Sequence, residues 1–158
     1  MDMLVRLYDL PSEGNRLSLK ATLQAEGIEV RRAIAPEMHL VVEWVNKNFN
    51  PHWGSEVMAA FANNPTTCLI AIEKGEIQGF ACYEATAKAF FGPTGVSEKA
   101  RGKGIGKLLL LEALNGLKAL GYAYGIIGGV GPVEFYQKAV GAILIEGSTP
   151  GIYKNMLR

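Results

Sequence analysis

Three glycines lie where a strand-like segment gives way to a long leucine-rich helix pattern. They are Gly102, Gly104 and Gly106, and three basic residues accompany them: Arg101, Lys103 and Lys107. Glycine lets the backbone bend sharply and lets a ligand approach the main chain. The first N–H groups of a helix have no internal partner and lie at the positive end of its dipole. The segment therefore predicts a phosphate or pyrophosphate site, the alternative being a glycine-rich cap of a buried helix.

Neither common nucleotide-binding signature fits this loop. A P-loop requires glycine five residues before its Gly-Lys pair and a hydroxyl residue after the lysine, but Arg101 and Leu108 occupy those positions. The dinucleotide fingerprint requires a third glycine, which would fall on Lys107 or Leu109. The loop thus has the physical properties of a phosphate site without either signature.

The motif Arg101-x-x-Gly104-x-Gly106 resembles the Arg/Gln-x-x-Gly-x-Gly/Ala motif of the GNAT superfamily, the Gcn5-related N-acetyltransferases. A second segment, residues 135–142, is similar to that family's Phe-Tyr-x-Lys-x-Gly-Phe pattern, with one inserted residue before the glycine. The resemblance covers about residue 28 to the C-terminus. It implies an α/β (α+β) fold with a mixed, mostly antiparallel central β-sheet flanked by helices. A splayed strand pair would hold the cofactor, acetyl-CoA.

The resemblance also implies which residues hold the cofactor. The main chain of the loop would face the pyrophosphate, through Arg101, Gly102, Lys103, Gly104, Ile105, Gly106 and Lys107. Val96 would pair with the pantetheine arm and direct its N–H at the thioester oxygen. The Gly92-Pro93 pair fits a bulge that splays this strand, and it fits a simple strand break equally well.

Tyr136 lies where the family often uses a tyrosine to protonate the departing thiolate, and the alternative is that its ring packs beside Phe135. A general base is less evident, because no acid or histidine occurs between Phe90 and Val96. Glu84 is the candidate base, because burial would raise its pKa. The alternative is that Glu84 lies exposed to solvent at the end of a strand. Gly129 replaces the asparagine that many members carry seven residues before the tyrosine.

Phe49, His52 and Trp53 are predicted to wall the site of the acceptor amine, because the family places this site between the first helices and the closing strands. Packing in the core is the alternative for the aromatic residues. The predicted reaction is transfer of acetyl from acetyl-CoA to a primary amine of a small molecule or peptide by direct attack. An acyl-CoA-binding sensor without turnover is the alternative function.

The elements that position these residues follow from periodicity and turn residues. Helices are predicted over 12–26, with Ser12 as N-cap and Gly27 as stop, and over 36–49, 53–61, 107–120 and 132–140. Strands are predicted over 3–8, 28–34, 68–73, 77–86, 90–96, 124–128, 142–145 and 151–156. Residues 1–27 form an N-terminal extension of a short strand plus a helix packed on a domain of residues 28–158, in a single globular unit.

Composition narrows the remaining function classes. The 158 residues are 49% hydrophobic with a net charge of +1, which fits a globular domain and offers no nucleic-acid surface. No apolar run is long enough for a membrane span and the first residues lack a signal-peptide core, so a cytoplasmic protein is predicted. Cys68 and Cys82 are expected as buried free thiols, and no metal site is expected. Monomer and homodimer both remain open.

Overall fold

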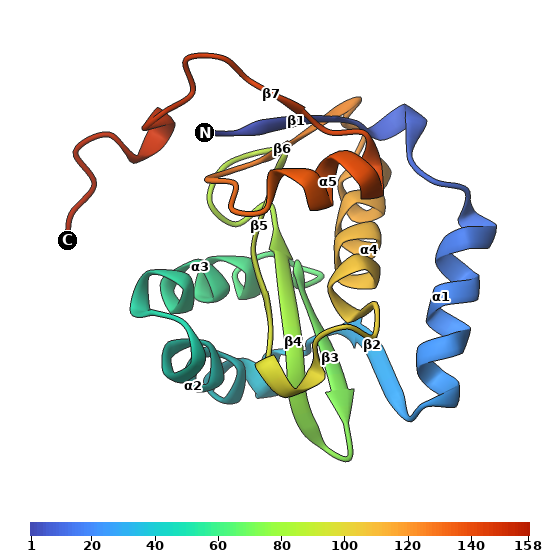
Figure 1. Ribbon diagram of the computed structural model, residues 1–158. Helices are drawn as coiled ribbons and strands as arrows, with labels where there is room; N and C mark the ends of the chain where they lie inside the picture. The colour runs from blue at the N-terminus through green and yellow to red at the C-terminus, as the bar shows by residue number, and fades with distance from the viewer.

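A seven-stranded sheet forms the centre of the computed structural model, which describes residues 1–158 (Figure 1). The strand order is β2-β3-β4-β5-β6-β1-β7, and only the β5–β6 pair is parallel. This confirms the mixed, mostly antiparallel sheet. The strands are β1 (Met3–Arg6), β2 (Ile28–Arg32), β3 (Cys68–Glu73), β4 (Glu76–Tyr83), β5 (Phe90–Val96), β6 (Tyr124–Ile127) and β7 (Ile143–Leu144).

Helices cover both faces of the sheet (Figure 1). They are α1 (Glu13–Ala25), α2 (Met38–Asn48), α3 (Pro51–Phe61), α4 (Ile105–Ala119) and α5 (Val133–Val140), with short 3-10 turns at Leu7–Asp9, Ala35–Glu37, Glu98–Ala100 and Gly151–Tyr153. α2 and α3 lie on one side of the β3–β4 hairpin, and α1 and α4 lie on the other (Figure 1). The predicted helices are confirmed to within a few residues.

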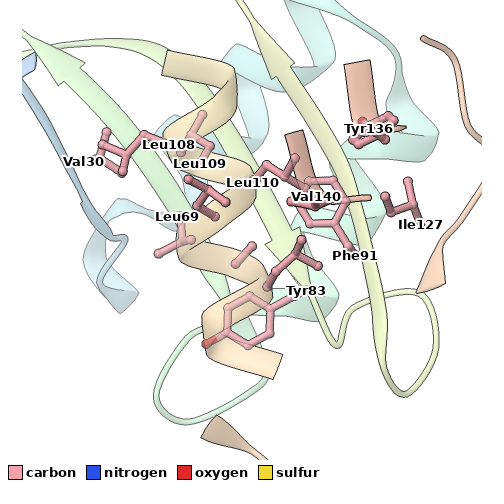
Figure 2. Close-up of a cluster of buried hydrophobic side chains, with 14 of the residues drawn as sticks. Val30, Leu69, Tyr83, Phe91, Leu108, Leu109, Leu110, Ile127, Tyr136 and Val140 are labelled. Atoms are coloured by element: carbon pink, nitrogen blue, oxygen red, sulfur yellow. The ribbon is translucent and has the colours of Figure 1, made fainter. Parts of the chain in front are cut away.

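The alternation of side chains along β3 and β4 builds two hydrophobic cores. Leu69 and Tyr83 belong to the larger core, which α4 fills with leucines (Figure 2). Ile70 and Phe80 point to the opposite face of the sheet and belong to the smaller core under α2 and α3. Cys68 and Cys82 lie opposite each other in this second core as buried free thiols, as predicted.

Local signals in the sequence set several boundaries. The Ser12 hydroxyl accepts a hydrogen bond from the N–H of Asn15 (3.3 Å) and caps α1. Gly27 has a φ of 85°, which glycine alone adopts at no steric cost, and the chain turns there into β2. Asn50 caps α3 by accepting from the N–H of Trp53 (2.9 Å).

Two predicted strands are corrected. Residues 151–156 do not form a strand: Gly151–Tyr153 is a 3-10 turn, and the chain continues without regular structure. The φ of 65° at Gly151 breaks the extended backbone, and Ile152 and Met156 stay exposed. The predicted strand 77–86 ends earlier, at Tyr83, because Glu84 has a φ of 55° and begins a loop.

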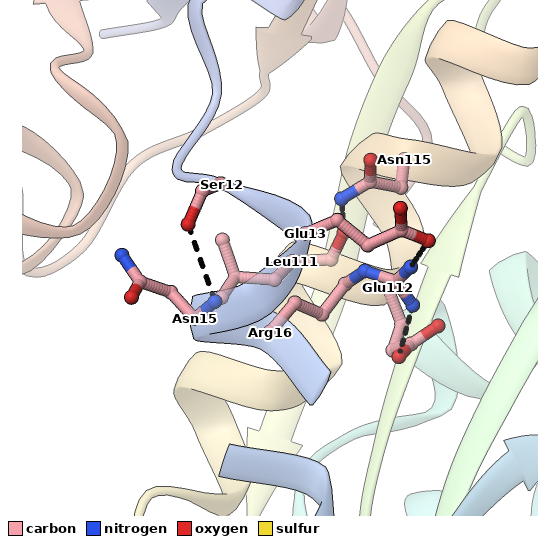
Figure 3. Close-up of polar contacts among 7 residues, drawn as sticks. All are labelled: Ser12, Glu13, Asn15, Arg16, Leu111, Glu112 and Asn115. Carbon is pink, nitrogen blue, oxygen red and sulfur yellow. Dashed lines mark hydrogen bonds and ion pairs between the residues drawn. The ribbon is translucent and has the colours of Figure 1, made fainter. Parts of the chain in front are cut away.

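The N-terminal strand lies inside the sheet. β1 pairs with β6 on one side and with β7 on the other, both antiparallel, and Met3 and Val5 are fully buried. α1 then packs on α4 through Arg16, whose guanidinium bonds Glu112 at 2.8 Å and Glu13 at 3.2 Å (Figure 3). Residues 1–27 therefore contribute a strand to the sheet and a helix to its α4 side.

Candidate active site

The site is built where β5 and β6 separate. These parallel strands pair only at Phe90 with Ile126 and at Phe91 with Ile127, and no ladder joins them beyond. The next two residues along β5 are Gly92, which has a φ of 119°, and Pro93. Proline offers no N–H to a neighbouring strand, so the pairing ends there. An opening between β5 and β6 results, and the start of α4 lies at the far end of β5.

The start of α4 presents a run of free backbone donors. The N–H groups of residues 102–107 donate no hydrogen bond within the chain, and no side chain caps the helix. Gly104, the N-cap residue, has a φ of 93°, and Gly102 has a φ of 84°. The basic side chains around the turn are exposed: Arg101, Lys103 and Lys107. These donors, the dipole and the charges fit a pyrophosphate group.

Val96 directs its backbone into the opening. The N–H of Ser97 donates to the Gln78 carbonyl of β4 (2.8 Å), and successive residues of a strand face opposite neighbours. The N–H and C=O of Val96 therefore face away from β4, and Arg101 Nε donates to that C=O (3.2 Å). Thr94, two residues earlier, faces the same way. Its N–H is therefore also turned away from β4, which side-chain identity does not reveal.

Tyr136 lies on α5 beside the paired end of β5. Its ring makes an edge contact with Phe91, with centroids 6.2 Å apart (Figure 2). It makes a second edge contact with Phe135, with centroids 5.1 Å apart. The residue is 5% exposed, and burial raises the pKa of its phenol to about 12. The hydroxyl therefore stays protonated near neutral pH, as a proton donor must.

Glu84 has other contacts. Its Oε1 accepts a hydrogen bond from the N–H of Ala89, and its Oε2 accepts one from the Tyr122 hydroxyl (3.1 Å). The first contact closes the loop between β4 and β5, and the second ties Glu84 to the segment between α4 and β6. The loop lies at the opposite end of β5 from Val96, a separation of about 20 Å at 3.3 Å per residue. The structure thus gives Glu84 a structural role and does not bring it to Val96.

The predicted acceptor residues lie on the other face of β5. Phe49 and Trp53 stack with ring centroids 4.9 Å apart, and both rings pack on Phe80 of the smaller core. His52, one residue earlier on α3, is exposed. Phe49 and Trp53 therefore pack on the core while lying beside the strand that borders the opening.

Gly129 is held by the N-terminus of the chain. The N–H of Gly129 donates to the Asp2 carboxylate (2.9 Å), and the N–H of Val130 donates to the Met1 carbonyl (2.9 Å). The loop before α5 is thus fixed without the asparagine common in the family. The sequence contains no local signal for this contact, because the partners are 127 residues apart.

A carboxylate that residue spacing did not single out lies beside the loop between β4 and β5. Glu56 of α3 is partly buried, and its Oε1 accepts from the Thr86 hydroxyl (2.6 Å). Burial raises the pKa of this carboxyl, although the Thr86 hydrogen bond and the charge of His52 oppose that shift. The sequence held one signal for this residue: Trp53 lies three residues before Glu56, and residues three apart lie on the same face of a helix.

A family model described as the acetyltransferase (GNAT) family matches residues 38–142. The chain belongs to this family. Among proteins with curated functions, no sequence matches the chain.

Solved structures show the same fold. The GCN5-related glucosamine N-acetyltransferase region of a fungal multi-domain β-N-acetylglucosaminidase is 20% identical, with a TM-score of 0.68 over 88% of this chain and 19% of that one. A GCN5-related N-acetyltransferase from Sphaerobacter thermophilus is 23% identical, with a TM-score of 0.67 over 91% of this chain and 47% of that one. This chain therefore spans less than half the length of either protein.

A GNAT family acetyltransferase from Brucella melitensis, solved with acetyl-CoA, is 22% identical, with a TM-score of 0.56 over 70% of this chain and 80% of that one. In the present structure, no three His, Cys, Asp or Glu side chains come together as metal ligands. None of the helices combines the length and hydrophobicity that crossing a bilayer requires.

Proposed function

We propose that this GNAT chain is an N-acetyltransferase that transfers acetyl from acetyl-CoA to a primary amine of a small molecule or peptide. The observation that carries the proposal is the run of free N–H groups over residues 102–107, beside exposed basic side chains. A pyrophosphate supplies the acceptor oxygens and negative charge that such a run stabilises. The Brucella relative with acetyl-CoA supports the same ligand.

Acetyl-CoA would supply a thioester carbonyl that an amine attacks directly. The backbone N–H groups of Val96 and Thr94, free of β4, would bind the developing oxyanion. Tyr136, which is protonated at neutral pH, would give its proton to the sulfur as the thiolate leaves, although the burial that raises its pKa to about 12 makes it a weaker acid. No residue of this scheme requires a metal, because thioester aminolysis needs only positioned donors and a base.

The proposal is tested in two steps with the intact chain. Titration calorimetry with acetyl-CoA measures binding, and a panel of primary amines with a free-thiol readout measures turnover. Binding together with thiol release that depends on an amine supports the enzyme. Binding without amine-dependent thiol release would favour the alternative, an acyl-CoA sensor. Absence of binding would refute both.

A further inference from the structure

A cavity of about 420 Å³ lies between α1 and α4, on the face of the sheet opposite α2 and α3 (Figure 1). Arg16 and Lys20 of α1 line it, and so does Ala119 of α4. Val30 of β2 and Leu69 of β3, both buried residues of the larger core, form its apolar floor. A cavity of this size accommodates a small organic molecule.

The cavity is separate from the cofactor loop. The first residue of α4 that lines it is Glu112, eight residues beyond the N-cap Gly104, which is about 12 Å along the helix at 1.5 Å per residue. Its α1 and β2 residues all precede residue 38, where the match to the family model begins. The cavity is therefore built largely from a part of the chain that the family model does not cover.

The charges that line the cavity are unbalanced. Arg16, Lys20 and Arg32 contribute three cations, and Glu112 contributes one carboxylate. Arg16 donates to Glu112 at 2.8 Å and to Glu13 at 3.2 Å, so these carboxylates already have a cationic partner (Figure 3). Lys20, which is half-buried, and Arg32 take part in no salt bridge. Two positive charges at the cavity are thus left without a counter-charge.

Arg32 is held in position by the fold. Its Nη1 donates to the Thr66 carbonyl (2.7 Å), and its Cζ lies 5.6 Å from the ring centroid of Tyr83. Its Nε and Nη2 donate no hydrogen bond within the chain. The neighbouring Arg31 differs, because both oxygens of Glu37 accept from its guanidinium at 2.9 and 2.7 Å. A fixed guanidinium with free donors loses little conformational freedom when it binds an oxyanion.

One donor in the cavity wall has no acceptor. Arg16 Nε is the only fully buried side-chain nitrogen or oxygen atom of the protein without a hydrogen-bond partner. Asn115, which also lines the cavity, uses its Nδ2 to donate to the Leu111 carbonyl (2.8 Å, Figure 3). An unpartnered donor on a buried charged group is costly. An oxyanion seated beside this guanidinium would lower that cost through its charge, even without contact with Nε.

We propose that this cavity binds a phosphate monoester with a small apolar group. Such an ester carries nearly two negative charges at neutral pH, which matches the two uncompensated charges of Lys20 and Arg32. Phosphate oxygens suit the forked donors of a guanidinium and the ammonium of a lysine. The apolar group would rest on Val30 and Leu69. This site is additional to acetyl transfer and does not depend on it.

The location of binding is tested by titrating the isotope-labelled full chain with phenyl phosphate and following backbone amide chemical shifts. One series contains saturating coenzyme A, which occupies the free donors of residues 102–107. We expect shifts centred on Lys20, Val30 and Asn115 in both series. Phenol, which has the same ring without the charge, should bind at least about tenfold more weakly.

Two matched variants test the charge. Lys20→Glu should raise the Kd for phenyl phosphate about tenfold or more, because it replaces an attractive charge with a repulsive one. Lys47→Glu makes the same change of net charge at an exposed lysine of α2, on the other face of the sheet, and should leave the Kd within about twofold of the parent. If Lys20→Glu unfolds, Lys20→Gln removes the charge without reversing it and should also weaken binding.

Four outcomes would overturn the proposal. Shifts confined to residues 102–107 that disappear with coenzyme A would mean that the phosphate binds only the cofactor loop. An unchanged Kd in the Lys20 variant would mean that the cavity does not hold the anion. Phenol binding as tightly as phenyl phosphate would mean an apolar pocket without anion recognition. Absence of any shift at millimolar phenyl phosphate would exclude the site. None of these measurements involves acetyl transfer, so the proposed function is tested separately.

Discussion

The ring of Phe49 fills the space in which a side chain at position 95 would begin. A Cβ on Gly95 would lie 2.3 Å from Phe49 Cζ and 2.8 Å from Cε1. The loop between α2 and α3 thereby rests directly on the backbone of β5, one residue before Val96. This one contact therefore positions both the aromatic pair, Phe49 and Trp53, and β5, the strand that borders the opening.

Gly95→Ala should destabilise the protein by about 1–3 kcal/mol, because the methyl group overpacks this contact. Chemical denaturation measures the loss. The double variant Gly95→Ala/Phe49→Leu should cost less than the sum of the two single changes, since the smaller side chain gives the methyl group room. A Gly95→Ala protein as stable as the parent would mean that the ring moves aside freely.

Lys107→Glu and Lys118→Glu form a matched pair at opposite ends of α4. At the first turn, glutamate favours the helix dipole but repels a pyrophosphate, so acetyl-CoA affinity should fall about tenfold while stability holds. At the last turn, Lys118→Glu opposes the dipole by about 0.3–1 kcal/mol and should leave affinity unchanged. Calorimetry at low salt and thermal unfolding measure both properties. Equal affinity for the two variants would place the phosphates elsewhere.

Much of the fold was predictable because it depends on local patterns. The helix caps at Ser12 and Asn50, the glycine stop at Gly27 and the glycines before α4 each act within a few residues. The position of β1 was not predictable in this way, since its partners β6 and β7 lie more than a hundred residues later. Residues 151–156 have strand-like composition, but the left-handed backbone at Gly151 prevents an extended run.

The candidate site also has parts that follow from local sequence patterns and parts that depend on distant residues. The cofactor loop is a contiguous motif, and its free N–H groups follow from its glycines and helix start. The environments of the two glutamates depend on residues outside their own elements. Tyr122 and Ala89 donate hydrogen bonds to Glu84, and Thr86 donates one to Glu56. Burial and hydrogen bonding decide which carboxylate is free to act, and neither is visible in residue spacing.

Tyr136→Phe keeps the ring that packs on Phe91 and removes only the hydroxyl. Since burial raises the pKa of Tyr136 to about 12, the parent residue is protonated throughout an ordinary assay and its loss should not shift the pH optimum. We expect kcat to fall roughly 100-fold with little change in acetyl-CoA affinity. Steady-state kinetics with calorimetry on the same preparation measure both. A kcat within about twofold of the parent would make Tyr136 a packing residue.

Glu56→Gln should change stability in a pH-dependent way. The pKa of Glu56 is raised in the fold by burial, so folding favours its neutral form. That contribution is complete below the unfolded value of about 4.3 and is lost as pH rises through the higher folded pKa. Relative to the parent, the variant should therefore gain stability as the pH rises from acid to neutral. Urea denaturation across pH tests this, and a variant less stable at neutral pH than at pH 4, relative to the parent, would contradict it.

Removal of β1 should disrupt the C-terminal half of the sheet. Met3 and Val5 are fully buried, and β7 has no other strand partner. Deletion of residues 1–6 would also remove the Asp2 carboxylate that holds Gly129 (2.9 Å), leaving the loop before α5 without its anchor. We expect loss of cooperative unfolding and of acetyl-CoA binding. Met3→Ala, a milder change, should cost about 2–5 kcal/mol because it leaves a cavity in the larger hydrophobic core. Deletion of residues 154–158, which are exposed and pair with no strand, is the matched control and should leave the unfolding transition unchanged. Cooperative unfolding of the chain without residues 1–6 would show that β6 and β7 close the sheet without β1.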